Sequence, residues 1–244
     1  MNYKKEWDEL GKLDPLWAVL SHADKRFGGW DNQAFFQTGE EEIKTVIQKI
    51  QKLGYPKDKK NVLDFGCGVG RLTRALSKYF EKSFGVDVSG AMIQKAKKLN
   101  KQETTISFQV NDRDDLSLFE DNFFDMIYCN IVLQHIPSKT QIKKYISEFI
   151  RTLAPGGIAV FQLPSKVPLL HRLQPQRRLY RLLSLFGFSH AFLYNTLKLY
   201  PIQMNWLSEK EVRNCVMVSG KMLLVEKDSS AGEKVESRLY FVTK

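Results

Sequence analysis

Three glycines alternate with other residues directly after an apolar run in the stretch NVLDFGCGVGRL, which spans residues 61–72. Glycine-rich turns of this kind let the backbone approach phosphates, dinucleotides and other nucleoside ligands. A Walker A phosphate loop and a dinucleotide loop both need another glycine where Arg71 stands. The third glycine comes one residue early, at Gly70. The loop departs from both patterns, so the residues around it must decide which ligand it fits.

Acidic residues stand in or after three successive apolar runs. Asp64 lies within the first run, two residues before Gly66, and Asp87 ends the second run. A carboxylate at the end of a second strand can accept hydrogen bonds from both hydroxyls of a ribose. Asp112 follows the third run, where it would be placed for an adenine amino group, and His135 follows the fourth. A histidine there could be a general base for a hydroxyl or amine nucleophile.

Strands that alternate with helices must position these residues. The pattern predicts a parallel sheet covered on both faces. Strands are expected at 62–65, 83–86, 106–110, 125–129 and 158–161, and helices at 71–80, 91–99 and through 142–150. Thr38 and Glu41 form a capping-box pattern that predicts the start of an earlier helix, and residues 22–36 are expected to form a loop. The stretch LAPGG is expected to turn the chain into the fifth strand.

The pattern breaks after the fifth strand. The segment 164–206 is basic and aromatic, and residues 149–208 contain no Asp or Glu. Regular structure is expected to resume with a helix at 209–218 behind Ser208 as N-cap, and with two strands over 221–228 and 237–244. Trp7, Leu10, Trp17 and Leu20 recur at helical spacing near the N-terminus.

Composition narrows the class of protein. The 244 residues are 43% hydrophobic and 26% charged, which suits a single domain with a substantial core. No run of eighteen apolar residues is present, and the first residues lack the apolar stretch of a signal peptide. The three cysteines have no metal-ligand spacing, so we expect reduced thiols, no metal site and a cytoplasmic location.

Together the motifs resemble the class I S-adenosylmethionine-dependent methyltransferases. That family carries an E/DxGxGxG loop, acidic residues after the second and third strands, and LxPGG before the fifth. The matching stretches here are LDFGCGVGR, GVDVS, QVNDRDDL, FFDMIYCNIVLQHIP and LAPGG. The resemblance implies an α/β, Rossmann-like, seven-stranded and mostly parallel sheet with an antiparallel C-terminal hairpin strand and helices on both faces. The single domain would comprise an N-terminal helical cap (1–37), a cofactor-binding core (38–163), a helical lid (164–206), and a C-terminal helix with a hairpin (207–244).

The resemblance also implies the cofactor, S-adenosylmethionine, with S-adenosylhomocysteine as its product. This cofactor has no pyrophosphate, and its carboxylate suits the N-terminus of the helix after the loop. The methionine part would be surrounded by Asp64, Gly66, Cys67, Gly68 and Gly70, with Asp64 orienting the ammonium group. The ribose would bind Asp87, and the adenine would meet Val88, Met92, Asp112 and the backbone of Arg113. The alternative for Arg113 is a plain surface side chain.

Further candidates lie near the expected position of the transferred methyl group. Asn130 and Gln134 follow the fourth strand, and Phe35, Phe36 and Thr38 belong to a segment that often folds over the cofactor in relatives. His135 is either a general base or a residue that orients the loop before Pro137. Methyl transfer from a reactive sulfonium can rely on positioning alone.

The segment 164–206 would hold the acceptor, and its candidate contacts are Arg177, Arg178, Arg181, Met204 and Trp206. Such residues suit an acceptor with an anionic or planar part. An amphipathic helix packed on the core, with its arginines in water, is an equal alternative. A helix at a membrane surface that presents a lipid-linked acceptor is a third, and nucleic-acid binding ranks last.

These features predict transfer of a methyl group to an oxygen or nitrogen of a small molecule, such as a sugar, a lipid-linked compound or a secondary metabolite. The alternatives are an RNA or protein methyltransferase and a non-catalytic cofactor-binding protein of the same fold.

Overall fold

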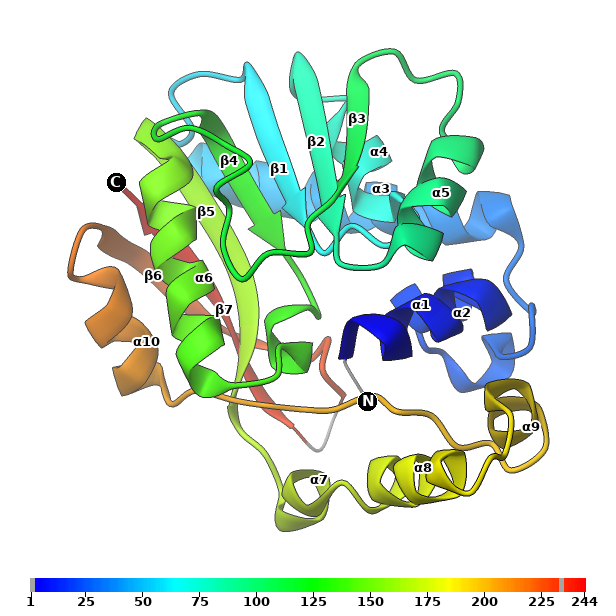
Figure 1. The fold of residues 1–244 in the computed structure, drawn as a ribbon. Coiled ribbons are helices and arrows are strands. Elements are labelled where there is room, and N and C mark those ends of the chain that lie inside the picture. The colour runs from blue at the N-terminus through cyan, green and yellow to red at the C-terminus, as the bar shows by residue number, and fades with distance from the viewer. Residues whose placement is uncertain (1–2, 233–234) are drawn as a thin grey trace.

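The computed structural model describes residues 3–232 and 235–244. Its centre is a seven-stranded sheet with the strand order β3-β2-β1-β4-β5-β7-β6 (Figure 1). The first five strands are parallel, and β7 is antiparallel to both β5 and β6. The strands are β1 (Asn61–Phe65), β2 (Lys82–Asp87), β3 (Ile106–Val110), β4 (Phe124–Cys129), β5 (Leu153–Lys166), β6 (Lys221–Asp228) and β7 (Glu236–Thr243). The predicted fold class is confirmed.

Helices cover both faces of the sheet because the central strands are apolar on both sides. Alternate residues of β4 point to opposite faces, and all six are buried. On one face α6 (Lys139–Thr152) and α10 (Glu209–Val216) pack around Ile127 and Cys129. On the other, α3 (Asn32–Lys52) and α4 (Arg71–Leu76) pack around Met126 and Tyr128. The helix α5 (Gly90–Leu99) packs on β3 through Phe108.

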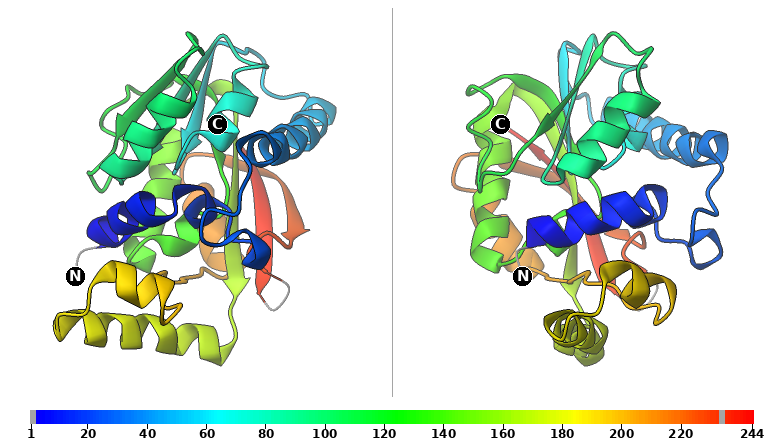
Figure 2. Two further views of the ribbon diagram at one scale, coloured as in Figure 1. Left: turned by 90° about the vertical axis from the view of Figure 1, so that its right-hand side faces the viewer. Right: turned by 45° about the vertical axis from the view of Figure 1, so that its right-hand side comes forward.

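Two further groups of helices lie beyond the carboxyl ends of the parallel strands (Figure 2). The cap consists of α1 (Tyr3–Leu13), α2 (Pro15–Val19) and the short 3₁₀ helix η1 (Ala23–Lys25). The lid contains α7 (Leu169–Leu173), α8 (Pro175–Leu185) and α9 (His190–Asn195). Cap and lid pack against each other: Tyr194 of α9 donates its hydroxyl to Asp14 Oδ2 at 2.9 Å, and its ring meets Trp17 edge-on. The cap therefore lies between the sheet and the lid.

The helix predicted to start at Thr38 begins six residues earlier, at Asn32. Asp31 is its N-cap, with Oδ1 accepting from the Ala34 amide at 2.9 Å. Thr38 lies inside the helix, and its hydroxyl donates to the Phe35 carbonyl at 2.7 Å. The expected loop over 22–36 is therefore wrong in its last residues, because the Asp31 cap and the burial of Phe35 extend the helix backwards.

Three other boundaries also differ from the prediction. The helix expected at 71–80 ends at Leu76, where the Ser77 hydroxyl donates to the Arg74 carbonyl at 2.8 Å and closes a turn. LAPGG forms the irregular start of β5 rather than a turn, with a register shift against β4 and Gly156 at φ +78°. The last helix, α10, ends at Val216 rather than at residue 218. Its predicted N-cap, Ser208, is confirmed as part of a capping box with Glu211.

Candidate functional site

A cavity of about 660 Å³ lies at the carboxyl ends of β1, β2 and β4. Its walls come from the glycine loop, the residues after each strand, the cap and the first turn of α8. Open α/β sheets bind ligands at this edge, in the crevice beside the point where the strand order reverses. Here that point lies between β1 and β4. The cavity is therefore where the fold places a ligand.

The glycine loop forms one end of the cavity, and its glycines are required by close packing. Gly66 and Gly68 have φ values of +76° and +52° and both line the cavity. A Cβ at Gly66 would lie 2.4 Å from Val132, and one at Gly68 would lie 2.3 Å from Val19 of the cap. Gly70 is different, because it lies away from the cavity and packs against Phe108. Only the first two glycines form a cradle that a ligand can enter.

Asp87 holds this cradle in place. Its Oδ2 accepts from the Gly68 amide at 3.0 Å, and its Oδ1 accepts from the Ser89 amide at 2.8 Å. Asp87 lines the cavity together with Val88 and Met92 of the following turn and α5. Burial raises the pKa of the Asp87 carboxyl to about 6, although the two amide hydrogen bonds oppose this shift. The carboxylate is negative at neutral pH and suits a cationic or hydroxyl-bearing ligand.

Asp64 lies beneath the loop rather than in the cavity lining. It is buried, and its Oδ2 accepts from the Thr73 hydroxyl at 2.6 Å. Burial raises the pKa of the Asp64 carboxyl to about 7, against the opposing effects of Thr73 and Arg71. The structure therefore brings Asp64 into contact with α4, and it does not place its carboxylate on the cavity wall.

Replacing Asp64 by Asn is expected to change the pH dependence of stability. Because the fold raises this pKa from 3.8 to about 7, the stabilising contribution is complete below pH 3.8 and is lost as pH rises through 7. The unfolding free energy of the wild type should fall relative to Asp64→Asn across that window, by at most about 1.4 kcal/mol per pH unit. Urea unfolding over a pH series measures the difference.

Asp112→Asn is the control for that series, since Lys4 holds the pKa of the exposed Asp112 carboxyl below its ordinary value. The contribution of the Asp112 carboxyl to the free energy of unfolding has the opposite pH dependence and is lost as pH falls. A difference between wild type and Asp64→Asn that stays constant with pH would contradict the assignment to Asp64.

Arg71 carries an unsatisfied donor at the same end of the cavity. Its guanidinium bonds Glu42 Oε2 at 2.8 Å and the Thr38 hydroxyl at 3.3 Å, while its buried Nε has no partner among the described residues. Glu42 also accepts from the Asn130 amide at 2.7 Å. A buried donor without a partner is costly, so the Arg71 Nε fits a ligand acceptor group such as a carboxylate. Sequence patterns did not indicate Glu42 or this role for Arg71.

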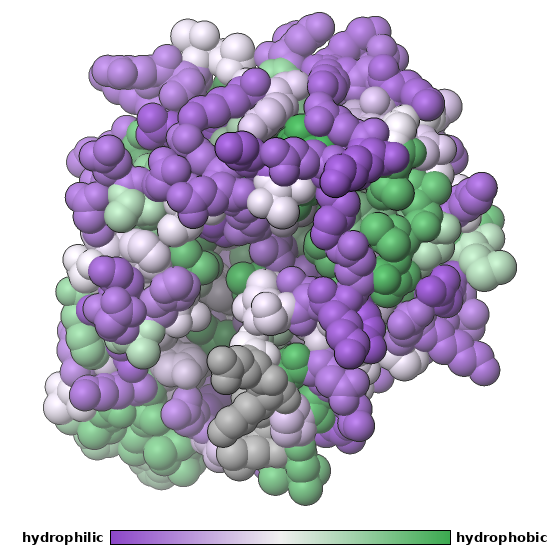
Figure 3. Space-filling view, turned by 180° about the vertical axis from the view of Figure 1, so that it is seen from behind, coloured by the Kyte–Doolittle hydropathy of each residue, from purple (hydrophilic) through white to green (hydrophobic). Residues whose placement is uncertain are grey.

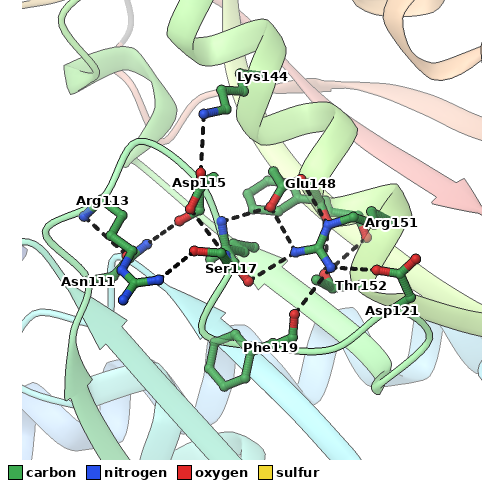
Figure 4. A network of polar contacts seen from close by, with 12 residues as sticks. Asn111, Arg113, Asp115, Ser117, Phe119, Asp121, Lys144, Glu148, Arg151 and Thr152 are labelled. Atoms are coloured by element: carbon green, nitrogen blue, oxygen red, sulfur yellow. Dashed lines mark hydrogen bonds and ion pairs between the residues drawn. The ribbon is translucent and has the colours of Figure 1, made fainter.

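The loop after β3 is held by α6 (Figure 4). Glu148 accepts from the Leu116 amide at 2.8 Å, and Arg151 donates to the Leu116 carbonyl at 3.0 Å. Arg113 points its guanidinium at the Ser117 hydroxyl, 2.8 Å away, and Asp112 pairs with Lys4 of the cap at 2.9 Å. Neither Asp112 nor Arg113 lines the cavity. The residue from this loop that does is the neighbouring Asn111.

His135, in the 3₁₀ helix η2 (Leu133–His135), also lines the cavity. Its Nδ1 lies 2.6 Å from the Gln203 carbonyl, so Nδ1 carries the proton and Nε2 keeps its lone pair. Burial lowers the pKa of His135 to about 4, so the ring is neutral near pH 7. The Gln203 amide donates back to the His135 carbonyl at 2.6 Å. The lid thus fixes both the tautomer and the orientation of the ring.

Aromatic and apolar side chains surround His135. The Trp7 ring of α1 lies 5.3 Å from the His135 ring, centre to centre. Tyr3 and Trp17 from the cap and Tyr200 from the lid also line the cavity. The helical spacing of Trp7 and Trp17 indicated only a packed face, and Tyr3 carried no signal that pointed to a ligand.

The arginines of the lid do not share one environment. Arg177 lines the cavity, and with Arg181 it pairs with the buried Glu6 of α1, at 3.6 and 2.6 Å. Arg178 is exposed, and Trp206 lies outside the cavity with Lys139 and Arg172 over its ring. The alternative in which these arginines point into water does not hold for Arg177, which pairs with Glu6 on the inward side of α8.

The structure brings about half of the predicted site residues into one cavity. Those on its wall are Gly66, Cys67, Gly68, Asp87, Val88, Met92, Asn130, Gln134, His135, Arg177 and Met204. Those outside the lining are Asp64, Gly70, Asp112, Arg113, Phe35, Phe36, Thr38, Arg178, Arg181 and Trp206. In the described ranges 3–232 and 235–244, no group of three or more His, Cys, Asp or Glu side chains could hold a metal ion.

Comparison with known proteins matches the central part of the chain to a family. Residues 63–161 match a family described as methyltransferase domain. The ubiquinone biosynthesis O-methyltransferase of Coxiella burnetii is 36% identical over 120 residues, which cover 49% of this chain and 47% of that protein. The chain thus spans about half the length of the curated relatives it matches.

Solved structures agree with the fold. The PH0226 protein of Pyrococcus horikoshii OT3 is 25% identical, with a TM-score of 0.56 over 83% of this chain and 91% of that chain. The magnesium protoporphyrin IX methyltransferase of Synechocystis PCC 6803, solved with bound S-adenosylhomocysteine, is 17% identical, with a TM-score of 0.63 over 100% of both chains. Residues 63–161 therefore match a methyltransferase domain, and the chain shares its overall fold with these solved structures.

Proposed function

We propose that this protein transfers a methyl group from S-adenosylmethionine to an oxygen or nitrogen of a small, largely apolar acceptor. The observation that carries the proposal is the continuity of the cavity. One space of about 660 Å³ is lined by Gly66, Gly68 and Asp87, which we call its first or cofactor end, and by Trp7 and His135, which we call its second or acceptor end. A donor and an acceptor in such a space would meet between Asn130 and Gln134.

The residues of the first end suit the cofactor. Asp87 would accept from the ribose hydroxyls, and Val88 and Met92 would flank the adenine. Arg71 would offer its free Nε to the methionine carboxylate, while the glycine cradle admits the chain beside it. When bound, this cofactor supplies an electrophilic methyl group on a sulfonium.

The chain's own contribution to the reaction is then mainly positioning. Holding two reactants in line can supply about 7 to 11 kcal/mol of the barrier reduction. Asn130 is fixed by Glu42, and Gln134 accepts from the Gln162 amide at 3.3 Å, so both side chains are held in place. The His135 Nε2 is unprotonated near pH 7 and can accept a proton from an acceptor hydroxyl as the methyl group is transferred.

Replacing His135 by Ala or by Asn is expected to lower turnover by about 100-fold or more, with no loss of S-adenosylhomocysteine affinity. The Asn variant retains an N–H donor near the Nδ1 position but lacks the Nε2 lone pair. If Asn preserved turnover, His135 would act by holding the Gln203 segment rather than as a base. The turnover of the wild type should show no inflection from this residue between pH 6 and pH 8, because burial lowers its pKa to about 4.

The lining of the second end suggests the class of acceptor. Trp7, Trp17 and Tyr200 offer ring faces and edges, and Arg177 offers one cation beside Gln174. A planar, apolar acceptor with a hydroxyl group fits these walls, as does one joined to a lipid chain. The related Coxiella burnetii protein is an O-methyltransferase of ubiquinone biosynthesis by name, which supports an oxygen acceptor of this kind.

A transfer assay with methyl-labelled S-adenosylmethionine tests this function directly. Phenols and hydroquinones with and without a short prenyl tail form one arm, and sugars, RNA and protein form the others. Label is expected on the phenolic arm. Label on RNA or protein alone, or S-adenosylhomocysteine binding without transfer to any arm, would support one of the alternative functions.

A further inference from the structure

The lid helix α8 carries apolar side chains on both of its faces. Its inward face combines Tyr180 and Leu183, which pack against Leu193 and Leu199, with Arg177 and Arg181, which pair with the buried Glu6 of α1. Its outward face carries the exposed side chains of Leu179, Leu182, Leu185 and Phe186. A surface helix normally turns its apolar stripe to the core. Nothing among the described residues covers this outward stripe.

The apolar surface extends over the neighbouring helices. Among the described residues, fourteen large hydrophobic side chains are exposed, and nine of them lie between 169 and 197. They form what we call the lid face, which consists of Leu169, Leu173, Leu179, Leu182, Leu185, Phe186, Phe188, Phe192 and Leu197. Seen from behind, hydrophobic side chains gather along the lower edge of the molecule, where α7 to α9 lie (Figure 3). A contiguous exposed patch of this kind indicates an interaction surface.

The charge around the lid face identifies the partner. Residues 149–208 contain no acidic side chain, and Arg172, Arg178 and Lys198 lie among the exposed apolar residues. Glu6, the acid that neutralises the inner arginines, is buried on the other side of α8. Apolar side chains interspersed with cations suit the boundary between the headgroups and acyl chains of an anionic bilayer.

The lid face is also continuous with the cavity. Gln174, Pro175 and Arg177, at the start of α8, line the cavity, while Leu173 and Leu179 on either side of them are exposed. The same short segment thus borders both the acceptor end of the cavity and the apolar surface. An acceptor dissolved in a bilayer against the lid face would therefore have a short path into the cavity.

We propose that the lid face rests on an anionic lipid bilayer and that the acceptor enters the cavity from the membrane at the α7–α8 junction. The entry of the acceptor from the membrane rests on the proposed function, whereas the contact of the lid face with the bilayer does not. A second copy of the chain fits the lid face less well, because a two-fold contact would bring the same cations of both copies together. In the described ranges no helix is long and apolar enough to cross a membrane.

Vesicle flotation tests the contact with the full chain. Vesicles of phosphatidylcholine and vesicles that also contain phosphatidylglycerol are the probes. The wild type is expected to float with the anionic vesicles and to be partly released by high salt. The double variant Leu185→Glu with Phe186→Glu should bind at least about tenfold more weakly, since it places two charges where apolar side chains would insert.

The matched control is Met217→Glu with Val218→Glu. These two residues follow α10 and are exposed to a similar degree, 74% and 83% against 85% and 75% for Leu185 and Phe186. The control should bind anionic vesicles as the wild type does. Unchanged S-adenosylhomocysteine affinity and melting temperature in both double variants would show that folding is intact.

Two results would overturn the proposal: wild-type protein that ignores anionic vesicles, or a Leu185/Phe186 variant that floats as well as the control. A wild-type dimer that the same variant dissociates would assign the lid face to a second copy instead. Methyl transfer to a soluble, tail-less acceptor separates the membrane contact from the proposed function. It should survive the Leu185/Phe186 change, and its absence in the wild type would count against the proposed function, not against membrane contact.

Discussion

Replacing Asp87 by Ala should reduce S-adenosylhomocysteine affinity by at least about 100-fold, the largest effect we expect from removing one side chain at the cofactor end. Two amide donors, on Gly68 and Ser89, lose their acceptor at once. Each hydrogen bond to a charged group contributes about 1.5 to 3 kcal/mol. The ribose would lose its acceptor as well, and the glycine cradle would lose its support. Calorimetric titration with S-adenosylhomocysteine measures the loss.

Asp112→Ala is the matched control for Asp87→Ala. It also removes an aspartate that follows a strand, but its side chain is exposed, pairs with Lys4 and lies outside the cavity lining. We expect it to change the affinity little. The titration also has a pH signature: because the pKa of Asp87 is raised to about 6, cofactor affinity should weaken as pH falls below that value. Equal losses for the two variants would contradict the role given to Asp87.

Replacing Glu6 by Ala should destabilise the protein by about 3 kcal/mol, the second large effect. The change removes the carboxylate that Arg177 and Arg181 share and leaves two partly buried guanidinium groups beside each other without their shared countercharge. Breaking a buried ion pair in this way typically costs about 3 to 5 kcal/mol, and the lower end applies because the Arg181 side chain is 35% exposed. Urea unfolding measures the change, and limited proteolysis should cut the lid first.

Glu9→Ala is the control on the same helix. Glu9 pairs with Lys12 one turn away on the surface, where ion pairs contribute little to stability. The lid of the Glu9 variant should resist proteolysis as the wild type does. A Glu6 variant that matched the Glu9 variant in both measurements would mean that the apolar contacts of Trp17 and Tyr194 hold the lid on their own.

The parallel core could be predicted because its signals are local. Each central strand is a short apolar run, and helices α5 and α10 begin at N-caps, Ser89 and Ser208, that the sequence shows directly before them. The start of α3 could not be predicted from Thr38 and Glu41, because Asp31 offers a cap of equal quality seven residues earlier. The deciding contact is the burial of Phe35 against the N-terminal helices α1 and α2, which joins distant parts of the fold.

The part of the cavity lined by the glycine loop and Asp87 could be located in the same way, from the sequence motif. The part lined by Trp7 and His135 could not, because its residues converge from opposite ends of the chain. Trp7 meets His135 across more than a hundred residues, and Glu6 meets Arg181 across an even longer separation. In the sequence the lid is uniformly basic, because the acid that pairs with its arginines, Glu6, lies far away on α1.

The measurement that tests the central claim most directly is a calorimetric titration of the wild type and of Gly68→Val with S-adenosylhomocysteine. A Cβ at Gly68 would already lie 2.3 Å from Val19, so the valine must displace the cap or fill the cradle. We predict saturable binding to the wild type and none to the variant, which circular dichroism should show to be folded. Absence of binding to the wild type, or equal binding to a folded variant, would contradict a cofactor site at this loop.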